Sequence, residues 1–138
     1  MKPILLDTGV VVALLDRSEK HHRRCAEVVA GLARPLVTCE AVIAESCYLL
    51  RQLSGAPEVV LENVAKGVFL IPFQLSRTAA SVRSILRKYS DLPADFADAC
   101  LTHLADELST GEILTLDRNF THYRWRKNRR FDLLIDLS

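Results

Sequence analysis

The sequence lacks the features that mark several special classes of protein. Its net charge is only +1, so the overall charge identifies no partner. The longest run without a charged residue, positions 67–76, covers ten residues, whereas a membrane-spanning helix needs about 20. No signal-peptide pattern follows Met1, and the four cysteines have no CxxC spacing. We therefore expect a cytoplasmic protein with buried, reduced thiols.

Composition and periodicity predict a single α/β domain. Hydrophobic residues make up 49% of the 138 residues and charged residues 25%, without repeats or low-complexity segments, which favours one domain over residues 1–138. Short apolar runs predict strands at 4–6, 36–37, 69–71, 113–116 and 133–135. Helical spacing predicts helices at 10–15, 19–32 and 40–53, from 56, and at 76–88 and 94–108, with Ser76 as an N-cap, Pro93 at a start and Gly111 at an end.

The strands are continuous apolar runs, which is typical of a parallel sheet covered on both faces. The predicted fold class is α/β: a three-layer α/β/α sandwich with a mainly parallel, open sheet. Ligands of such sheets bind beyond the carboxyl ends of the strands. Polar residues that follow a strand directly are therefore the first candidates for a site.

Two aspartates stand at predicted strand ends. Asp7 follows the strand 4–6, and Asp117 follows the strand 113–116. An N-cap for Asp7 and a turn residue for Asp117 are the structural alternatives. In the functional interpretation, both carboxylates point into the crevice at the edge of the sheet.

Three further acids lie on predicted helices. Glu45 falls within the apolar stripe of its helix, without a basic residue three or four positions away, so that only a distant arginine would neutralise it. Asp95 and Asp98 share one helix face although like charges repel there. Asp95 also suits the first turn, where the helix dipole favours an acid, whereas Asp98 lies deeper among apolar residues.

If these carboxylates meet in one crevice, they need cations for stability. Oxygen ligands without histidine or thiolate suit Mg²⁺ or Mn²⁺, and the four histidines show no zinc-ligand spacing with a cysteine. Because no serine or cysteine stands beside a plausible histidine base, the residues favour attack by water that divalent metal ions activate.

Four segments together resemble the PIN domain. They are Ile4-Leu5-Leu6-Asp7-Thr8, the stretch from Glu40 to Glu45, Asp95-Phe96-Ala97-Asp98-Ala99, and the stretch from Leu114 to Phe120. Their order and spacing look most like the toxin ribonucleases of the VapC type, over essentially the whole chain. The resemblance implies a metal-dependent endoribonuclease that cuts single-stranded RNA, including loops of structured RNA, and that pairs with a cognate antitoxin. A homodimer is the family's usual assembly.

The resemblance also assigns roles to residues. Asp7, Glu45, Asp98 and Asp117 match the acidic quartet that binds the metal and catalyses, and Asp95 matches a further acid of many toxins. Thr8 and Thr115 match hydroxyl positions that support the metal ligands. Asn119 departs from the pattern, because an aspartate is frequent there, and a second ion would then bind weakly.

A basic stretch follows Asp117 directly. Residues 118–131 contain no acid, and without their six cations the chain has 12 basic residues against 17 acidic ones, a net charge of −5. Interleaved aromatic rings are typical of single-strand binders. A solvated loop and a docking site for an acidic protein segment are the alternatives. The predicted RNA-binding residues are Arg118, Arg124, Trp125, Arg126, Lys127, Arg129 and Arg130, and we expect them near the metal site.

Three other functions compete with the nuclease toxin. A phosphatase of the haloacid-dehalogenase type needs a second aspartate two residues after the first, where this chain has Gly9. A non-catalytic α/β module, such as a receiver-like domain or a PIN domain that only binds RNA, would show no metal-dependent cleavage. A housekeeping RNA-processing nuclease would not stop bacterial growth when expressed alone.

Overall fold

The computed structural model describes residues 1–137, so residue 138, the last of the predicted domain, lies outside the described residues. Five strands form one sheet in the order β3-β2-β1-β4-β7, and every neighbouring pair is parallel. The strands are β1 (Ile4–Leu6), β2 (Leu36–Val37), β3 (Phe69–Leu70), β4 (Glu112–Leu114) and β7 (Asp132–Leu133). The three residues of β1 have no exposed surface because helices cover the middle of the sheet on both faces.

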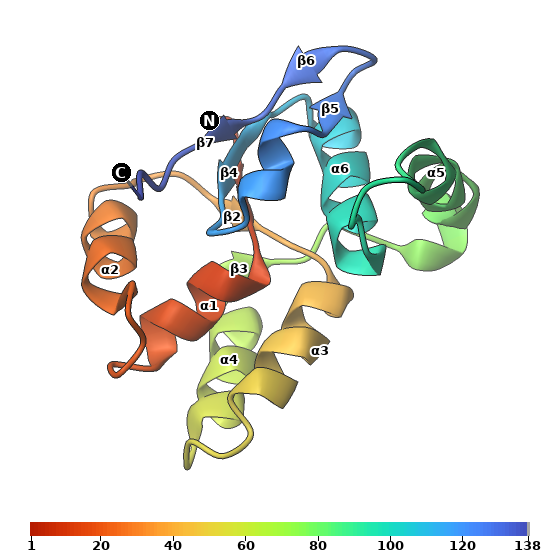
Figure 1. Ribbon diagram of the computed structural model, residues 1–138. Helices are drawn as coiled ribbons and strands as arrows, with labels where there is room; N and C mark the ends of the chain where they lie inside the picture. Colours follow the sequence, from red (N-terminus) through yellow and green to blue (C-terminus); the bar gives the residue numbers. More distant parts are fainter. Residues whose placement is uncertain (138) are drawn as a thin grey trace.

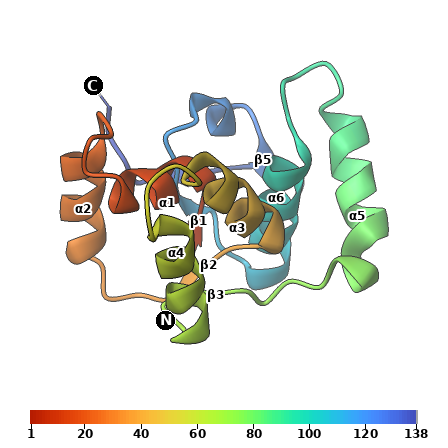
Figure 2. The same cartoon turned by 90° about the horizontal axis from the view of Figure 1, so that it is seen from below.

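The helices enclose this sheet in three layers. They are α1 (Thr8–Leu15), α2 (His22–Ala30), α3 (Glu40–Leu49), α4 (Ala56–Ala65), α5 (Leu75–Lys88) and α6 (Phe96–Leu108). Figures 1 and 2 show α2 on one side of the sheet and α6 on the other, with α5 packed outside α6. Helices α3 and α4 lie beyond the carboxyl ends of the strands, at the bottom of Figure 1. The predicted three-layer α/β/α sandwich is confirmed.

Element boundaries differ from the prediction at several helix ends. Ser76 lies inside α5, whose N-cap position is Gln74. Pro93 lies outside α6, which begins after Asp95 because the Asp95 side chain caps its first turn. The helix predicted at 40–53 ends at Leu49, and residues 50–55 form the turn to α4.

Gly111 has a packing role instead of the predicted helix-ending role. Ser109 ends α6 in the left-handed conformation, with φ of 55°. A Cβ atom on Gly111 would lie 2.1 Å from Nε1 of Trp125, so only glycine lets the indole ring approach this closely.

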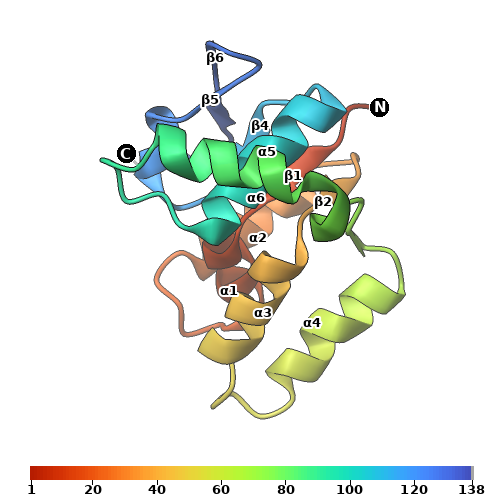
Figure 3. The same cartoon turned by 90° about the vertical axis from the view of Figure 1, so that its right-hand side faces the viewer.

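A short hairpin was not predicted from the basic stretch. It consists of β5 (Arg124–Trp125) and β6 (Arg129–Arg130), which pair antiparallel, and it follows a 3₁₀ helix, η1 (Arg118–Thr121). Figures 1 and 3 place this hairpin at the end of the molecule opposite α3 and α4. It therefore lies at the amino-terminal edge of the sheet, away from the carboxyl ends of the strands.

Candidate active site

Asp7 is fixed at the carboxyl end of the central strand β1. Its Oδ1 accepts a hydrogen bond from the Thr8 amide at 2.8 Å, which makes it the N-cap of α1. Its Oδ2 accepts from the Thr115 hydroxyl at 2.6 Å. The side chain is only 7% exposed. Asp7 can therefore cap α1 and still bind a ligand, because a capping carboxylate keeps free lone pairs.

Glu45 reaches the same place from α3. Its Oε1 accepts from the Thr8 hydroxyl at 2.6 Å, so Thr8 connects Asp7 to Glu45 through one residue. The prediction that Glu45 lies in the buried stripe of its helix is wrong: Glu45 is exposed, as is Leu49 one turn later. The buried face of α3 carries Val42 and Ile43 instead.

Asp95 and Asp98 form a capping box at the start of α6. The Asp98 amide donates to Oδ1 of Asp95 at 2.9 Å, and the Asp95 amide donates to Oδ2 of Asp98 at 3.2 Å. Asp95 is exposed, whereas Asp98 is 7% exposed. The exchange of hydrogen bonds with backbone amides explains how two acids tolerate the same helix face.

Thr115 and Asp117 come from the loop after β4. The buried Thr115 hydroxyl donates to Asp7 and accepts from the Asp117 amide at 3.0 Å, and so ties the two strand ends together. Oδ1 of Asp117 accepts from the Asn119 amide at 2.9 Å and caps η1. Asn119 is half-buried beside it.

Tyr123 belongs to this site and was missed as such by sequence reasoning. Its hydroxyl donates to Oδ2 of Asp98 at 3.4 Å, and its ring is 1% exposed and packs against Tyr89 and Phe120. Burial and the nearby carboxylates raise the pKa of this phenol, so it stays a donor. Because Tyr123 stands among basic residues in the sequence, an exposed ring was expected. No signal in the sequence distinguishes an exposed ring from a buried one at this position.

The buried carboxylates of the site carry uncompensated charge. Burial raises the pKa of Asp7 to about 6, with smaller contributions from Asp117 and Glu45. Burial, together with the charges of Asp95, Asp7 and Asp117, raises the pKa of Asp98 to about 7. Among residues 1–137, no ion pair involves any of these acids. The cluster therefore favours binding of a cation from solution.

The donor set fits a hard divalent cation. All its candidate ligands are oxygens, and two of the carboxylates are held in fixed orientations by hydroxyl and amide donors. With the side chains as they stand, no three Asp, Glu, His or Cys side chains of residues 1–137 are grouped closely enough to hold one ion. A cation held by Asp7 and Asp98 would therefore need a third carboxylate, such as the exposed one of Glu45 or the half-buried one of Asp117, to turn toward them.

Most of the predicted RNA-binding cations are not at this site. The backbone amide of Arg126 donates to Asp106, and its guanidinium contacts Ser109, both near the C-terminal end of α6. Asp98 is in the first turn of the same helix, about 12 Å away along its axis. The expectation that the whole basic stretch lies near the acids is therefore wrong, because η1 and β5 lead the chain along α6 to the opposite edge.

Two more predicted RNA contacts have structural partners. Trp125 is 6% exposed, packs over Gly111 and donates from Nε1 to the Arg130 carbonyl at 3.1 Å, so its ring is not available to stack on a base. Arg124 is half-buried and donates to the Thr121 and Tyr123 carbonyls, both at 2.9 Å. Arg118, one residue after Asp117, is exposed beside the carboxylates.

A depression beside the acids has an aromatic rim. Its volume is about 340 Å³, and its lining includes Glu45, Asp95 and Phe96. Phe96 is 43% exposed although it begins a helix that is otherwise largely buried. Sequence reasoning used Phe96 only as part of a motif, and an aromatic residue between two acids at a helix start is the signal that could have singled it out.

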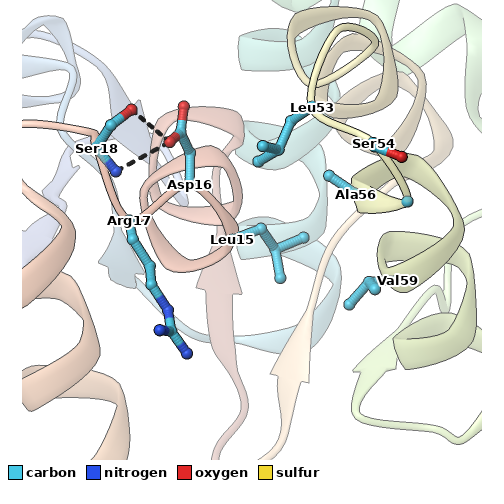
Figure 4. Close-up of a pocket in the computed structure, with 9 residues that line it drawn as sticks. Leu15, Asp16, Arg17, Ser18, Leu53, Ser54, Ala56 and Val59 are labelled. Carbon is cyan, nitrogen blue, oxygen red and sulfur yellow. Dashed lines mark hydrogen bonds between the residues drawn. The ribbon is translucent and has the colours of Figure 1, made fainter.

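A larger cavity lies elsewhere. It has a volume of about 540 Å³ and lies between the end of α1 and the turn before α4 (Figure 4). Its apolar lining includes Leu15, Leu53 and Val59, and none of the clustered acids contributes to it. Asp7 is at the other end of α1, about 12 Å along the helix axis from Leu15.

The sequence matches the model of a known family. The model of the PIN-domain family matches residues 4–126. The chain therefore belongs to the PIN-domain family.

Its relatives place it more narrowly. Ribonuclease VapC26 of Mycobacterium tuberculosis (strain ATCC 25618 / H37Rv) is 32% identical over 117 residues, 83% of this chain and 87% of that protein. The crystal structure of Mycobacterium tuberculosis VapC20, a toxin that cleaves the sarcin-ricin loop, shares the fold with a TM-score of 0.79 at 16% identity, over 86% of this chain and 93% of VapC20. Within its family, the chain is of the VapC type. Separately, no helix within residues 1–137 is both long and apolar enough to cross a bilayer.

Proposed function

We propose that this chain is a divalent-metal-dependent endoribonuclease, and that it is the toxin of a toxin–antitoxin pair. One observation carries the proposal: acids from separate elements meet at one sheet edge, two of them buried and none ion-paired within residues 1–137. Such an arrangement is unfavourable for stability alone, because buried charges without partners cost several kcal/mol. The names of the relatives support RNA as the substrate.

The proposed ligands of the cation are Asp7, Asp98, Asp117 and Glu45, with Asp95 in support. When bound, Mg²⁺ or Mn²⁺ would make water a better nucleophile and would stabilise charge on the phosphate. Thr115 and the Thr8 amide fix both oxygens of Asp7, and the Thr8 hydroxyl holds Glu45. Tyr123 orients Asp98 by its hydrogen bond, and the burial of its phenol keeps the proton in place.

We assign substrate contacts near the reacting phosphate to Arg118 and Phe96. Arg118 is exposed next to Asp117, where its guanidinium can pair with a phosphate. The exposed ring of Phe96 lies at the rim of the acidic depression, where an unstacked base can pack on it. Recognition of an unstacked base favours single-stranded RNA or a loop as the substrate.

Cleavage assays with purified protein test this proposal. A labelled single-stranded RNA should be cut with Mn²⁺ or Mg²⁺, should stay intact with EDTA, and should give 5′-phosphate ends. Metal-independent cleavage, or none with any divalent ion, would contradict the metal-dependent mechanism.

Growth assays test the toxin assignment separately. Expression of the chain alone should stop bacterial growth, while the Asp7→Asn variant should not. A nuclease that cuts RNA in vitro but leaves growth unaffected would be the housekeeping alternative. Rescue by a neighbouring gene product would identify the cognate antitoxin.

A further inference from the structure

We propose that the cationic hairpin, residues 124–130, is a second RNA-binding surface that holds the phosphate backbone of a long substrate away from the cleaved bond. RNA as the ligand rests on the proposed function. The hairpin lies at the amino-terminal edge of the sheet, and the carboxylates lie at the carboxyl-terminal edge (Figures 1 and 3). A substrate that touches both must extend along the molecule.

The cations of this hairpin are available to a ligand. Arg126, Lys127, Arg129 and Arg130 are all exposed. In the described part of the chain, no ion pair involves any of them, although Asp106 accepts the Arg126 amide and Asp132 follows close in sequence. Glu112, the other acid near this edge, is paired with Arg34. The hairpin therefore presents four exposed cations without an ion pair within residues 1–137, although the Arg126 guanidinium also contacts the Ser109 hydroxyl.

The tip of the hairpin keeps charged residues at a conformational cost. Arg126 and Lys127 have φ of 45° and 70°, in the left-handed region that favours glycine. Glycine or asparagine would suit these positions better if the turn served only to connect β5 and β6. The presence of two cations at these left-handed positions supports a role for their side chains.

The base of the hairpin is held firmly. The Trp125 indole packs on Gly111 at the start of β4, and the Arg129 guanidinium lies 5.3 Å from the centroid of its ring. The Arg126 amide is anchored to Asp106 at the end of α6. The cations are thus presented from a fixed platform, which reduces the entropy lost when a ligand binds.

The closely spaced cations of the hairpin suit the sugar–phosphate backbone of RNA better than they suit the acidic surface of a folded protein. Phosphates repeat along a single strand, and each one that is neutralised by Lys or Arg releases condensed counterions. The chain also leads without any acid from Arg118, beside the carboxylates, to Arg130 on the hairpin. One RNA strand can therefore meet cations at both edges.

Binding of RNAs of two lengths tests the inference. The probes are fluorescein-labelled oligouridylates of about 2 and about 30 nucleotides, and the Asp7→Asn background prevents cleavage. Removing two cations with Arg129→Ala and Arg130→Ala should weaken binding of the longer RNA about tenfold and flatten its log–log salt slope by about 1.4. The affinity for the shorter RNA should stay within about twofold, because it cannot reach both surfaces.

A charge-matched control separates local contacts from overall charge. Arg83→Ala and Arg87→Ala remove two exposed cations from α5. This control should bind both RNAs like the parent. Equal losses in the control and the hairpin variant would overturn the inference, since non-local charge would then explain both.

The strained tip allows a second test that misfolding cannot mimic. Lys127→Gly removes a cation and also relieves the left-handed strain, so the melting temperature should rise while affinity for the longer RNA falls. Lys127→Arg should keep the affinity. If the hairpin variants bind the longer RNA like the parent, the inference fails, and an acidic protein segment becomes the favoured partner. Failure of wild-type cleavage would instead contradict the proposed function, without affecting these binding results.

Discussion

The two edges of one parallel sheet carry charge in different ways. At the carboxyl-terminal edge, Asp7 and Asp98 are buried, and this burial, with a smaller contribution from nearby acids, raises their pKa values. At the amino-terminal edge, the hairpin cations are exposed to water. An exposed cation costs little free energy without a partner, whereas a buried carboxylate costs several kcal/mol. The acidic edge is therefore the stronger indication of function, and the basic edge needs a binding test.

The largest effect is expected from a substitution at the centre of the acidic edge. Asp7→Asn should lower the rate of metal-dependent cleavage at least ~100-fold, because a charged ligand of the cation is lost. The fold should persist, since the asparagine carbonyl can still accept the Thr8 amide at the start of α1.

Asp16→Asn is the matched control for this change. Asp16 stands at the other end of α1, where its carboxylate is exposed and accepts from Ser18. Cleavage by this variant should equal that of the wild type. Residual activity of Asp7→Asn at the wild-type level would show that the site lies elsewhere or that another nuclease is present.

The second prediction separates the two acids of α6. Asp98→Asn should abolish cleavage, whereas Asp95→Asn should reduce it about tenfold or less, because Asp95 is exposed and acts mainly as an N-cap. Single-turnover rates at saturating Mn²⁺ measure both. Equal losses would mean that Asp95 is itself an essential ligand.

The sequence predicted the parallel sheet well, because buried strands such as Ile4–Leu6 are uninterrupted apolar runs that only a covered sheet explains. It also placed Asp7 at the end of a strand, whereas Asp117 lies in the loop after β4, which ends at Leu114 rather than at the predicted residue 116. It was wrong about Glu45, because helical spacing alone does not say which of two partly apolar faces of α3 is buried.

The location of the hairpin at the amino-terminal edge of the sheet could not be predicted from the sequence. Closeness in sequence between Asp117 and Arg126 suggested closeness in space, but η1 and β5 carry the chain to the far edge. The burial of Trp125 depends on its contact with Gly111, fourteen positions earlier, which no local pattern reveals. Tyr123 reaches Asp98 by a similar long-range contact.

A third prediction measures the cost of the buried carboxylates without metal. Their pKa values, about 6 for Asp7 and about 7 for Asp98, exceed the ordinary value near 3.8, so the folded state holds more protons than the unfolded state between these limits. In EDTA, the contribution of these two acids to stability should therefore be complete below about pH 4 and should be lost as the pH rises from there through 6 and 7. Asp7 alone accounts for up to ~3 kcal/mol of this loss.

Melting curves in EDTA at pH 5 and pH 8 check this sign. Asp98→Asn should raise the melting temperature at pH 8 and reduce the difference between the two pH values. At pH 8, Mg²⁺ or Mn²⁺ should stabilise the wild type by mass action and should stabilise Asp98→Asn less. A wild type that is more stable at pH 8 than at pH 5 in EDTA would contradict the assignment of these two acids as uncompensated.

The smallest expected effect concerns the aromatic rim of the acidic edge. Phe96→Ala should lower kcat/KM for single-stranded RNA about tenfold, within the ~1–3 kcal/mol that stacking on one base contributes. Phe96→Trp should keep most of the activity because it preserves a flat ring. Leu75→Ala is a closely matched control, because Leu75 is also an apolar residue at a helix start with 43% exposure, on α5. If Phe96→Ala and Leu75→Ala cut equally well, the ring has no part in binding RNA. If Phe96→Ala loses activity and Phe96→Trp loses as much, the position serves packing at the start of α6 and not base stacking.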